Sequence, residues 1–442
     1  MPTDHGRRRA AVLDAMRAAS PAGAVAVFPS TPTAIRNNDV EHDYRQDSDL
    51  YYLTGFDEPS SVLLLSTAHG DHGSVLFLRE RDPDREVWDG PRLGTERAPE
   101  ALGIDAAFPI GELAKQLPGY LAGARRLYYA LARDSDFDRG IFRAVAALEP
   151  RQRREGVRVP VEFVDPSVIV HEMRLFKDSS EVALMRKAAE ITAEAHRRAM
   201  EVARPGRFEY EVEAEILRVF RAHGCERSAY GSIVGSGPNA TVLHHRRNDR
   251  KMEKGDLLLI DAGAEYGYYA SDVTRTFPVD GTFTEPQRLL YDVVLRAQKA
   301  AMEATRPGAT MGDVHRAAAE VTVDGLSSLG LLAGSREEIL ERESYKAFFM
   351  HKTSHYLGMD VHDVGSYFVA EGKQRPLEPG MVITVEPGIY VAPGAEVDSK
   401  WHGIGIRIED DLLVTESGND VLTASIPKDP QEIESILAAR ST

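Results

Sequence analysis

The chain has 442 residues, of which 69 are acidic and 53 are basic, giving a formal net charge of −16. This length suits two or three domains with large cores, and the negative charge makes nucleic acids and anionic membranes poor partners. One cysteine, Cys225, excludes a disulfide framework within the chain, and no apolar stretch approaches the roughly 20 residues that span a bilayer. We therefore expect a cytoplasmic protein.

The first part of the chain alternates strand-like and helical segments. The strand-like runs are AVAVFP, SVLLLS, SVLFL and RLYYAL, and the helical runs are PEALG, GELAKQLPGYLAG and FDRGIFRAVAALE. This alternation predicts an α/β domain with its own core. RQRREG, residues 151–156, is expected to be a charged loop. The following segment, VEFVDPSVIVHEMRLFKD, is expected to lead into a second domain, so we predict domains at 1–173 and 174–442.

The second domain is predicted to begin with a long helix. Asp178 and Glu181 have the spacing of a capping box at its start. Two nearby motifs are not expected to carry chemistry. HEMRL lacks the second histidine of a zinc HExxH motif, and GSGPN has no following Lys-Ser/Thr, so we expect a turn rather than a phosphate-binding loop.

Five side chains able to bind metals follow in the C-terminal half, namely Asp261, Asp272, His355, Glu386 and Glu409. Four carboxylates and one imidazole suit a pair of hard-to-borderline divalent cations. Two such ions about 3.5–4 Å apart can share a hydroxide and polarise a carbonyl. A single acidic residue is most often a solvated charge, but five in this arrangement indicate metal-assisted hydrolysis.

The carboxylates stand on strand patterns. Asp261 ends the apolar run LLLI, where an unpaired charge would be costly to bury. In MVITVEPG, alternation places Glu386 on one face of a strand. In GIGIRIEDD the isoleucines alternate with polar positions, so a strand is expected to present Arg407 and Glu409 together. We therefore expect the carboxylates at strand ends, facing one way.

An internal repeat relates two of these strands. EKGDLLLIDAG, residues 253–263, and EPGMVITVEPG, residues 378–388, place an acid, a glycine, an apolar run, an acid and a glycine at identical offsets. Upstream, ARPGRFEYEVEAEI is echoed by TRPGATMGDVHRAA. We predict a duplicated α/β half-unit with Asp261 and Glu386 as equivalent strand-end ligands, and a metal pair near the pseudo-two-fold axis.

Segments along almost the whole chain resemble Xaa-Pro aminopeptidases, the aminopeptidase P enzymes of the pita-bread metallopeptidase group. They are SDLYYLTGFDEP, VHEMRLFKD, IVGSGPNAT, LHH, LLLIDAG, SDVTRTFP, SHYLGMDVHDVG, TVEPGIY and GIGIRIEDD. The resemblance implies an N-terminal α/β domain, a pseudo-two-fold pita-bread catalytic domain, and two divalent ions, usually manganese. It also implies the release of the N-terminal residue from peptides with proline in the second position, by a hydroxide that bridges the two ions.

The resemblance also assigns the metal ligands. Asp261 would bind one ion, Asp272 and Glu409 would bridge both, and His355 and Glu386 would complete the second. Beside the nucleophile, Glu386 would hold or relay its proton.

Other matching residues would line the active site. His362 would stabilise the developing oxyanion, and His244 would contact the scissile region or protonate the leaving nitrogen. His351 would contribute to the substrate pocket, and Arg407 would orient Glu409. In the resembled enzymes a tryptophan in the motif of Trp88 reaches a neighbouring subunit's active site, which implies a substrate contact and a homo-oligomer, a tetramer or dimer.

Several alternatives stay open at this point. His245 follows His244 where an aromatic residue is common, so either histidine could enter the site. Lys352 follows His351 where glycine is common, and its side chain could alter the preference for the residue after proline or point to solvent. A prolidase would share the fold and ligands but cleave only dipeptides. A non-catalytic pita-bread module is disfavoured because all five ligands are present.

Overall fold

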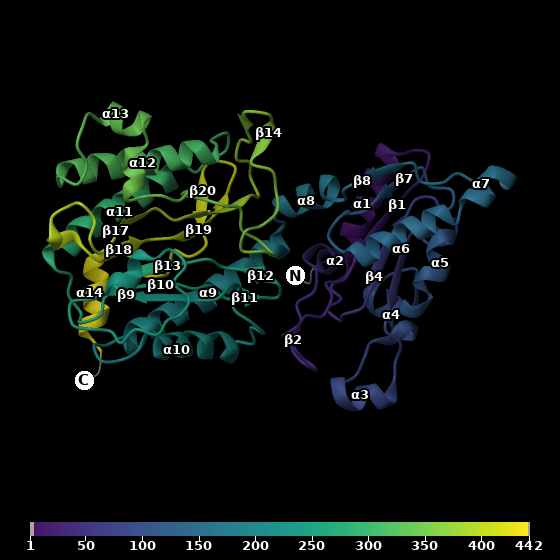
Figure 1. Ribbon diagram of the computed structural model, residues 1–442, viewed down its shortest axis with the longest axis horizontal. Helices are drawn as coiled ribbons and strands as arrows, with labels where there is room; N and C mark the ends of the chain where they lie inside the picture. The colour runs from purple at the N-terminus through teal and green to yellow at the C-terminus, as the bar shows by residue number, and fades with distance from the viewer. Residues whose placement is uncertain (1–3, 441–442) are drawn as a thin grey trace. The chain divides into compact units, whose positions relative to one another are not determined.

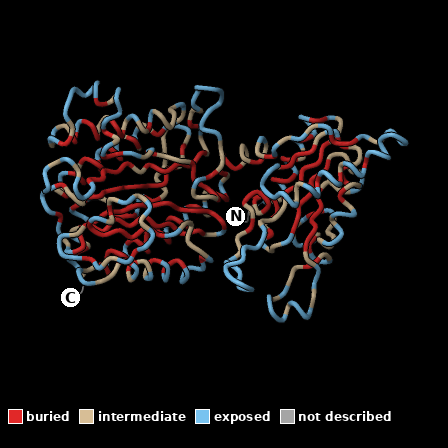
Figure 2. Tube along the Cα trace, in the orientation of Figure 1, coloured by how far each residue is buried: buried red, intermediate tan, exposed pale blue. Residues whose placement is uncertain are grey.

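The computed structural model describes residues 4–440 and divides into two compact units (Figure 1). The first unit ends at Met173 and the second begins at Arg174, inside helix α8 (Ser167–Leu175). Each unit has its own hydrophobic core, which follows the buried strands in Figure 2. None of the helices in the described part of the chain is long and apolar enough to cross a bilayer.

A six-stranded mixed sheet forms the centre of the first unit, in the order β6–β5–β4–β1–β7–β8. Its strands are β1 (Ala24–Pro29), β4 (Val62–Ser66), β5 (Ser74–Leu78), β6 (Ala106–Pro109), β7 (Arg126–Tyr128) and β8 (Glu162–Val164), and β2 (Ile35–Asn37) pairs with β3 (Val40–Glu41) outside it. The helices are α1 (His5–Ala19), α2 (Ser48–Thr54), α3 (Pro83–Asp89), α4 (Gly94–Leu102), η1 (Ile110–Glu112), α5 (Leu113–Leu121), α6 (Ser135–Ala146) and α7 (Glu149–Glu155). The four predicted strands are confirmed, and β4 and β5 are buried at every position because both their faces are apolar.

The prediction of a charged loop at residues 151–156 was wrong, because most of this segment is helix α7. Pro150 lies in the first turn, where its missing N–H costs no hydrogen bond, and Gly156 closes the helix in a left-handed conformation with φ of 70°. Between them, Arg151 and Glu155 form an ion pair at helical spacing. The charges of RQRREG are compatible with a loop, but Arg, Gln and Glu are also strong helix formers.

The second unit places its strands between two groups of helices, with α9 and α10 on one side and α11 and α12 on the other (Figure 1). Its helices are α9 (Ser179–Val202), α10 (Glu209–Ala222), η2 (Gly237–Thr241), α11 (Glu285–Ala304), α12 (Met311–Ser328), α13 (Arg336–Glu341), η3 (Ser344–Ala347), η4 (Ser399–Trp401) and α14 (Pro430–Ala438). Its strands are β9 (Ile233–Ser236), β10 (Leu257–Asp261), β11 (Glu265–Tyr266), β12 (Tyr269–Ala270), β13 (Thr274–Pro278), β14 (Phe368–Ala370), β15 (Lys373–Gln374), β16 (Val382–Val385), β17 (Gly388–Val391), β18 (Ile404–Arg407), β19 (Asp410–Val414) and β20 (Asn419–Val421). The predicted capping box of α9 is present, since Asp178 accepts hydrogen bonds from the N–H groups of Ser180 and Glu181, and Glu181 accepts one from the N–H of Asp178.

The two halves of this unit repeat one arrangement of strands. β10 pairs antiparallel with β13 around the β11–β12 hairpin, and β16 pairs antiparallel with β19 around the β17–β18 hairpin. Asp261 is the last residue of β10, and Glu386 directly follows β16. The two residues therefore occupy equivalent strand ends, as the internal repeat predicted.

The pairing register refines this equivalence. Ile260 lies opposite Arg275 in the first half, and Val385 lies opposite Asp410 in the second. Arg275 thus corresponds to Asp410, and the two form a buried ion pair of 2.7 Å. By the same register Thr274 corresponds to Glu409, and its hydroxyl donates to that carboxylate at 2.6 Å. Contacts between equivalent residues are expected where two related halves meet at a two-fold axis.

Candidate metal and catalytic site

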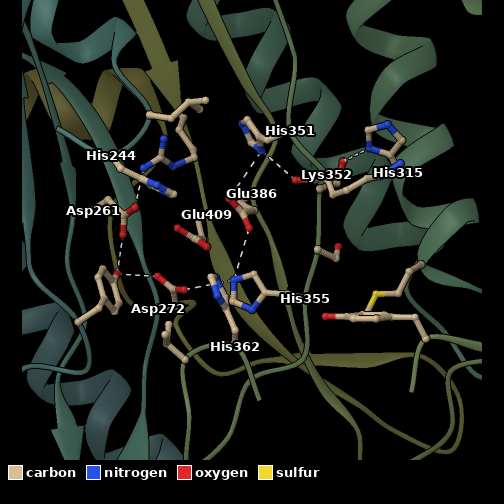
Figure 3. Close-up of a pocket in the computed structure, with 18 of the residues that line it drawn as sticks. His244, Asp261, Asp272, His315, His351, Lys352, His355, His362, Glu386 and Glu409 are labelled. Atoms are coloured by element: carbon tan, nitrogen blue, oxygen red, sulfur yellow. Dashed lines mark hydrogen bonds and ion pairs between the residues drawn. The ribbon is translucent and has the colours of Figure 1, made fainter. Parts of the chain in front are cut away.

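The five predicted ligands converge on one cavity of about 810 Å³ in the second unit. They come from the end of β10, the approach to β13, the loop before β14, the end of β16 and the step between β18 and β19. Figure 3 shows Asp272, Glu386, His355 and Glu409 directed toward a common centre. Ligand atoms of Asp272, His355 and Glu409 all lie within 4.8 Å of one another. Their arrangement can hold metal ions.

Tyr230 and Arg407 fix the carboxylates of the first half. The Tyr230 hydroxyl lies 2.5 Å from Oδ1 of both Asp261 and Asp272. The Arg407 guanidinium donates to the other oxygen of Asp261, also at 2.5 Å. The backbone N–H of Asp272 donates to the buried carboxylate of Asp411. Asp261 and Asp272 are therefore held side by side before any ligand binds.

Glu409 is held by both its backbone and its side chain. The Thr274 hydroxyl donates to Oε2 at 2.6 Å, and the fully buried Arg275 guanidinium donates to the Glu409 carbonyl at 2.5 Å. Arg275 also pairs with Asp410, whose other oxygen accepts from Gln298. These hydrogen bonds fix residues 408 and 409, which connect β18 to β19.

The ring of His355 is oriented as a metal ligand requires. Its Nδ1 donates to the carbonyl of Tyr356 at 3.0 Å, because a carbonyl can only accept. Nε2 then faces Asp272 at 3.4 Å and Glu386 at 3.5 Å. A backbone carbonyl that accepts the second ring N–H is the usual support of a metal-binding histidine.

The charges of the cluster are poorly balanced by the protein itself. Burial raises the pKa of Glu386 to about 8, with Asp272 and Asp261 adding to the rise against the opposing charges of His355 and Arg407. Burial and the neighbouring carboxylates hold the pKa of Glu409 well above its usual range. Buried carboxylates of this kind need cations. The donor set, the orientation of the His355 ring and the excess of buried carboxylates together fit divalent metal ions.

A chain of hydrogen bonds links Arg407 to His351. Arg407 donates to the Tyr390 hydroxyl at 2.9 Å, and that hydroxyl lies 2.9 Å from Nε2 of His351. Nδ1 of His351 donates to the carbonyl of Lys352 at 2.8 Å, so Nε2 accepts. Burial, with the nearby Arg407 charge, lowers the pKa of His351 to about 3, which keeps the ring neutral.

The other two histidines approach the cavity from different walls. His244 lines the cavity, whereas His245 turns away, with Nε2 3.1 Å from the fully buried Glu209. The structure therefore places His244, and not its neighbour, in the site. The ring of His362 stands edge-on to that of His355, with centroids 4.4 Å apart. Burial and the adjacent His355 lower the pKa of His362.

The expectation for Arg407 differs from the observed geometry. Arg407 pairs with Asp261 and not with Glu409, which it reaches only through the Thr274 hydroxyl. The continuous strand expected through Glu409 ends at Arg407, so the alternation of faces also ends there.

The tryptophan singled out in the sequence, Trp88, lies on α3 of the first unit with 84% of its surface exposed. The described residues that line the cavity all belong to the second unit.

Sequence reasoning missed several supporting residues, including Tyr230, Thr274, Arg275, Tyr390 and Asp411. Thr274 and Arg275 lie within SDVTRTF, a segment that forms a buried strand. An arginine in a buried strand was the available signal, because a buried arginine must have a partner. Tyr230 contacts carboxylates 31 and 42 residues away, which no local pattern reveals.

Two related halves that surround buried carboxylates and a histidine define a metal-dependent hydrolase of the pita-bread type. Residues 183–416 match metallopeptidase family M24, and residues 5–128 match the N-terminal domain family of aminopeptidase P. The chain is 46% identical to the Xaa-Pro aminopeptidase of Escherichia coli strain K12, over 98% of this chain and 97% of that protein.

Solved structures agree with these matches. Aminopeptidase PepP of Pseudomonas aeruginosa superposes with a TM-score of 0.96 at 49% identity, covering 100% of this chain and 99% of that one. A zinc-substituted E. coli aminopeptidase P in complex with product gives 0.94 at 45% identity, covering 99% and 98%. The chain belongs to metallopeptidase family M24 and carries an aminopeptidase P N-terminal domain.

Proposed function

We propose that the protein is an Xaa-Pro aminopeptidase, which releases the N-terminal residue from peptides whose second residue is proline. The observation that carries this proposal is the complete set of five ligating side chains around one cavity, in a chain that matches an Xaa-Pro aminopeptidase along almost its full length. A prolidase, restricted to dipeptides, is the second candidate, because it would use the same ligands.

Asp261, Asp272, His355, Glu386 and Glu409 would hold two divalent ions, with manganese as the ion we propose. Such ions, when bound, lower the pKa of water toward neutrality and polarise the scissile carbonyl. Within the protein, Asp272 and Glu409 occupy the centre of the donor set, and Asp261 and Glu386 flank it from equivalent strand ends.

The protein's own groups handle the protons and the developing charge. Glu386, which flanks the donor set, can hold a proton of the nucleophile and pass it on. His362 donates a hydrogen bond to the carbonyl oxygen as that oxygen becomes negative. On the far wall, His244 contacts the scissile region and can protonate the departing proline nitrogen, which must gain a proton to leave. His351, neutral and held by Tyr390, forms part of the wall that receives the substrate.

The exposed tryptophan of the first unit belongs to the same proposal. Trp88 and the neighbouring Val87 are 84% and 81% exposed on α3, an unusual position for two large apolar side chains. We propose that the protein forms a homo-oligomer, a tetramer or dimer, in which Trp88 closes a neighbouring subunit's substrate pocket.

The decisive assay compares peptides that differ in one property at a time. The chelated protein should be inactive, and manganese should restore hydrolysis of an Xaa-Pro-Yaa tripeptide. A matched Xaa-Ala-Yaa tripeptide should resist cleavage, since the pocket is built for a ring that lacks an N–H and has a fixed φ. Turnover of Gly-Pro alone, without the tripeptide, would assign the protein as a prolidase. No turnover of either peptide by the metal-loaded protein would remove both candidates.

A further inference from the structure

The cavity is lined by two cations that have no ionic partner, Arg246 and Lys352. Within residues 4–440 neither side chain forms an ion pair. The third lining cation, Arg407, is fully engaged by Asp261, Thr274 and Tyr390. In a chain with a net charge of −16, unpaired cations on the wall of a substrate cavity are available to a bound ligand.

The Lys352 side chain projects from a fixed stretch of backbone on one side of the metal ligands. Its carbonyl accepts from His351, and the hydroxyl of the buried Thr353 lies 2.8 Å from Nδ1 of His315. Figure 3 places Lys352 and His315 to one side of Glu386 and His355, with His244 on the opposite side. The Lys352 side chain therefore stands over one identifiable end of the cavity.

No side chain that lines that end of the cavity is acidic, and Glu343, which acts on His315 and Lys352 from outside the lining, is paired with Lys346. The further lining residues of this end include Met311, Gly312, Phe368 and Gln374, and every lining acid belongs to the metal-ligand cluster. Burial lowers the pKa of His315 to about 4, and the positive charges of Lys352 and Lys346 add to this effect. His315 is thus neutral, and the Lys352 ammonium provides the positive charge of this end.

Lys352 repels the N-terminal ammonium of a peptide and attracts a carboxylate, so it favours the orientation in which the part of the substrate beyond proline extends toward the lysine. Arg246, the other unpaired cation that lines the cavity, is the competing position for that carboxylate. One residue beyond proline spans about 3.5 Å, and a cavity of about 810 Å³ accommodates a short peptide.

We propose that Lys352 binds a carboxylate of the substrate beyond proline and thereby makes the enzyme favour peptides that are acidic on the leaving side. The carboxylate is either the C-terminus of a tripeptide or an Asp or Glu side chain in a longer peptide. The proposal rests on the Xaa-Pro aminopeptidase activity, and it adds a preference that this activity does not require.

Four tripeptides separate the two sources of carboxylate. Ala-Pro-Ala with a free C-terminus is compared with its amide, and the amide of Ala-Pro-Asp is compared with the amide of Ala-Pro-Asn. The manganese-loaded protein should show a higher kcat/KM for the charged member of at least one pair, by roughly three- to tenfold and mostly through KM. This advantage should shrink at high ionic strength. The pair that shows it identifies the carboxylate.

Substitutions test whether Lys352 is responsible. Lys352→Gln should bring the charged-to-neutral ratio close to one, and Lys352→Arg should retain most of it. Lys254→Gln removes the same charge from an exposed turn outside the cavity and should leave the ratio as in the original protein. Arg246→Gln tests the other unpaired cation.

Three results would overturn the assignment. They are an unchanged ratio in Lys352→Gln, an equal loss in Lys254→Gln, and a loss in Arg246→Gln alone. An original protein that cleaves none of the four peptides would instead contradict the aminopeptidase activity, so the two failures are distinguishable.

Discussion

Asp261 and Glu386 end equivalent strands in the two halves of the second unit, yet their surroundings differ sharply. Asp261 is bonded by Tyr230 and Arg407, both at 2.5 Å. Glu386 has only longer contacts, with His355 at 3.5 Å and His351 at 3.8 Å. The two halves therefore place carboxylates at equivalent strand ends, but the surrounding residues give Asp261 a fixed counter-charge and leave Glu386 with longer contacts.

Asp272 and Glu409, at the centre of the donor set, provide the strongest test of this comparison. Asp272→Asn and Glu409→Gln each remove one charge from the centre of the donor set with little change in shape. We expect both to lower kcat/KM by on the order of a thousandfold or more and to lower metal content, measured by elemental analysis. Glu416→Gln, an exposed residue after β19, is the matched control. Full activity in either central variant would contradict a metal site shared by the halves.

His362, which belongs to the second half, tests the proposed stabilisation of the developing oxyanion. Since it is proposed to donate to an oxygen that becomes charged only in the transition state, His362→Ala should lower kcat by on the order of a hundredfold. Metal content should change little. His223→Ala, in which an exposed ring paired with Glu194 is removed, should behave like the original protein. A variant that loses metal, or mainly raises KM, would assign His362 a different role.

Two threonines allow the hydrogen bonds that support Glu409 and Glu386 to be compared. Thr274 donates to Glu409 at 2.6 Å and accepts from Arg407, whereas Thr384 lies 3.5 Å from Glu386. Thr274→Val should therefore cost about 10- to 100-fold in metal affinity or activity, and Thr384→Val clearly less. Titration of the metal-free variants by calorimetry measures both effects. Equal losses would show that the two carboxylates are supported alike.

The smallest expected effect is on the pH dependence of the metal-free protein. The folded-state pKa of Glu386 is raised to about 8 and that of His355 to about 9, the latter because the hydrogen bond and charge of Asp272 outweigh burial. Both groups hold protons more tightly when folded, so stability should fall as pH rises from 6.5 to 8. The melting temperature in chelator should show this decline, and Glu386→Gln should weaken it. A melting temperature that rises over the same pH interval would contradict the raised pKa values of these two groups.

Part of the site could be predicted because two of the carboxylates stand on local patterns. Asp261 and Glu386 follow apolar runs whose burial is dictated by composition, and the internal repeat relates them. The partner of Arg407 could not be predicted, because the strand ends at this residue and the face it would share with Glu409 no longer exists. Likewise Tyr230 joins Asp261 and Asp272 only through tertiary packing, which periodicity does not encode.

The hairpins that separate the paired strands differ greatly in length. Two residues, 267 and 268, close the β11–β12 hairpin, whereas twelve, 392–403, connect β17 to β18. The four carboxylates lie at the bases of these hairpins, so the chain can grow at a tip without displacing one of them. Ala392, Pro393 and Gly394 are exposed, which makes this turn a permissive position for an inserted epitope or reporter domain. Natural variation in chain length within the second half is expected to concentrate at the same turn.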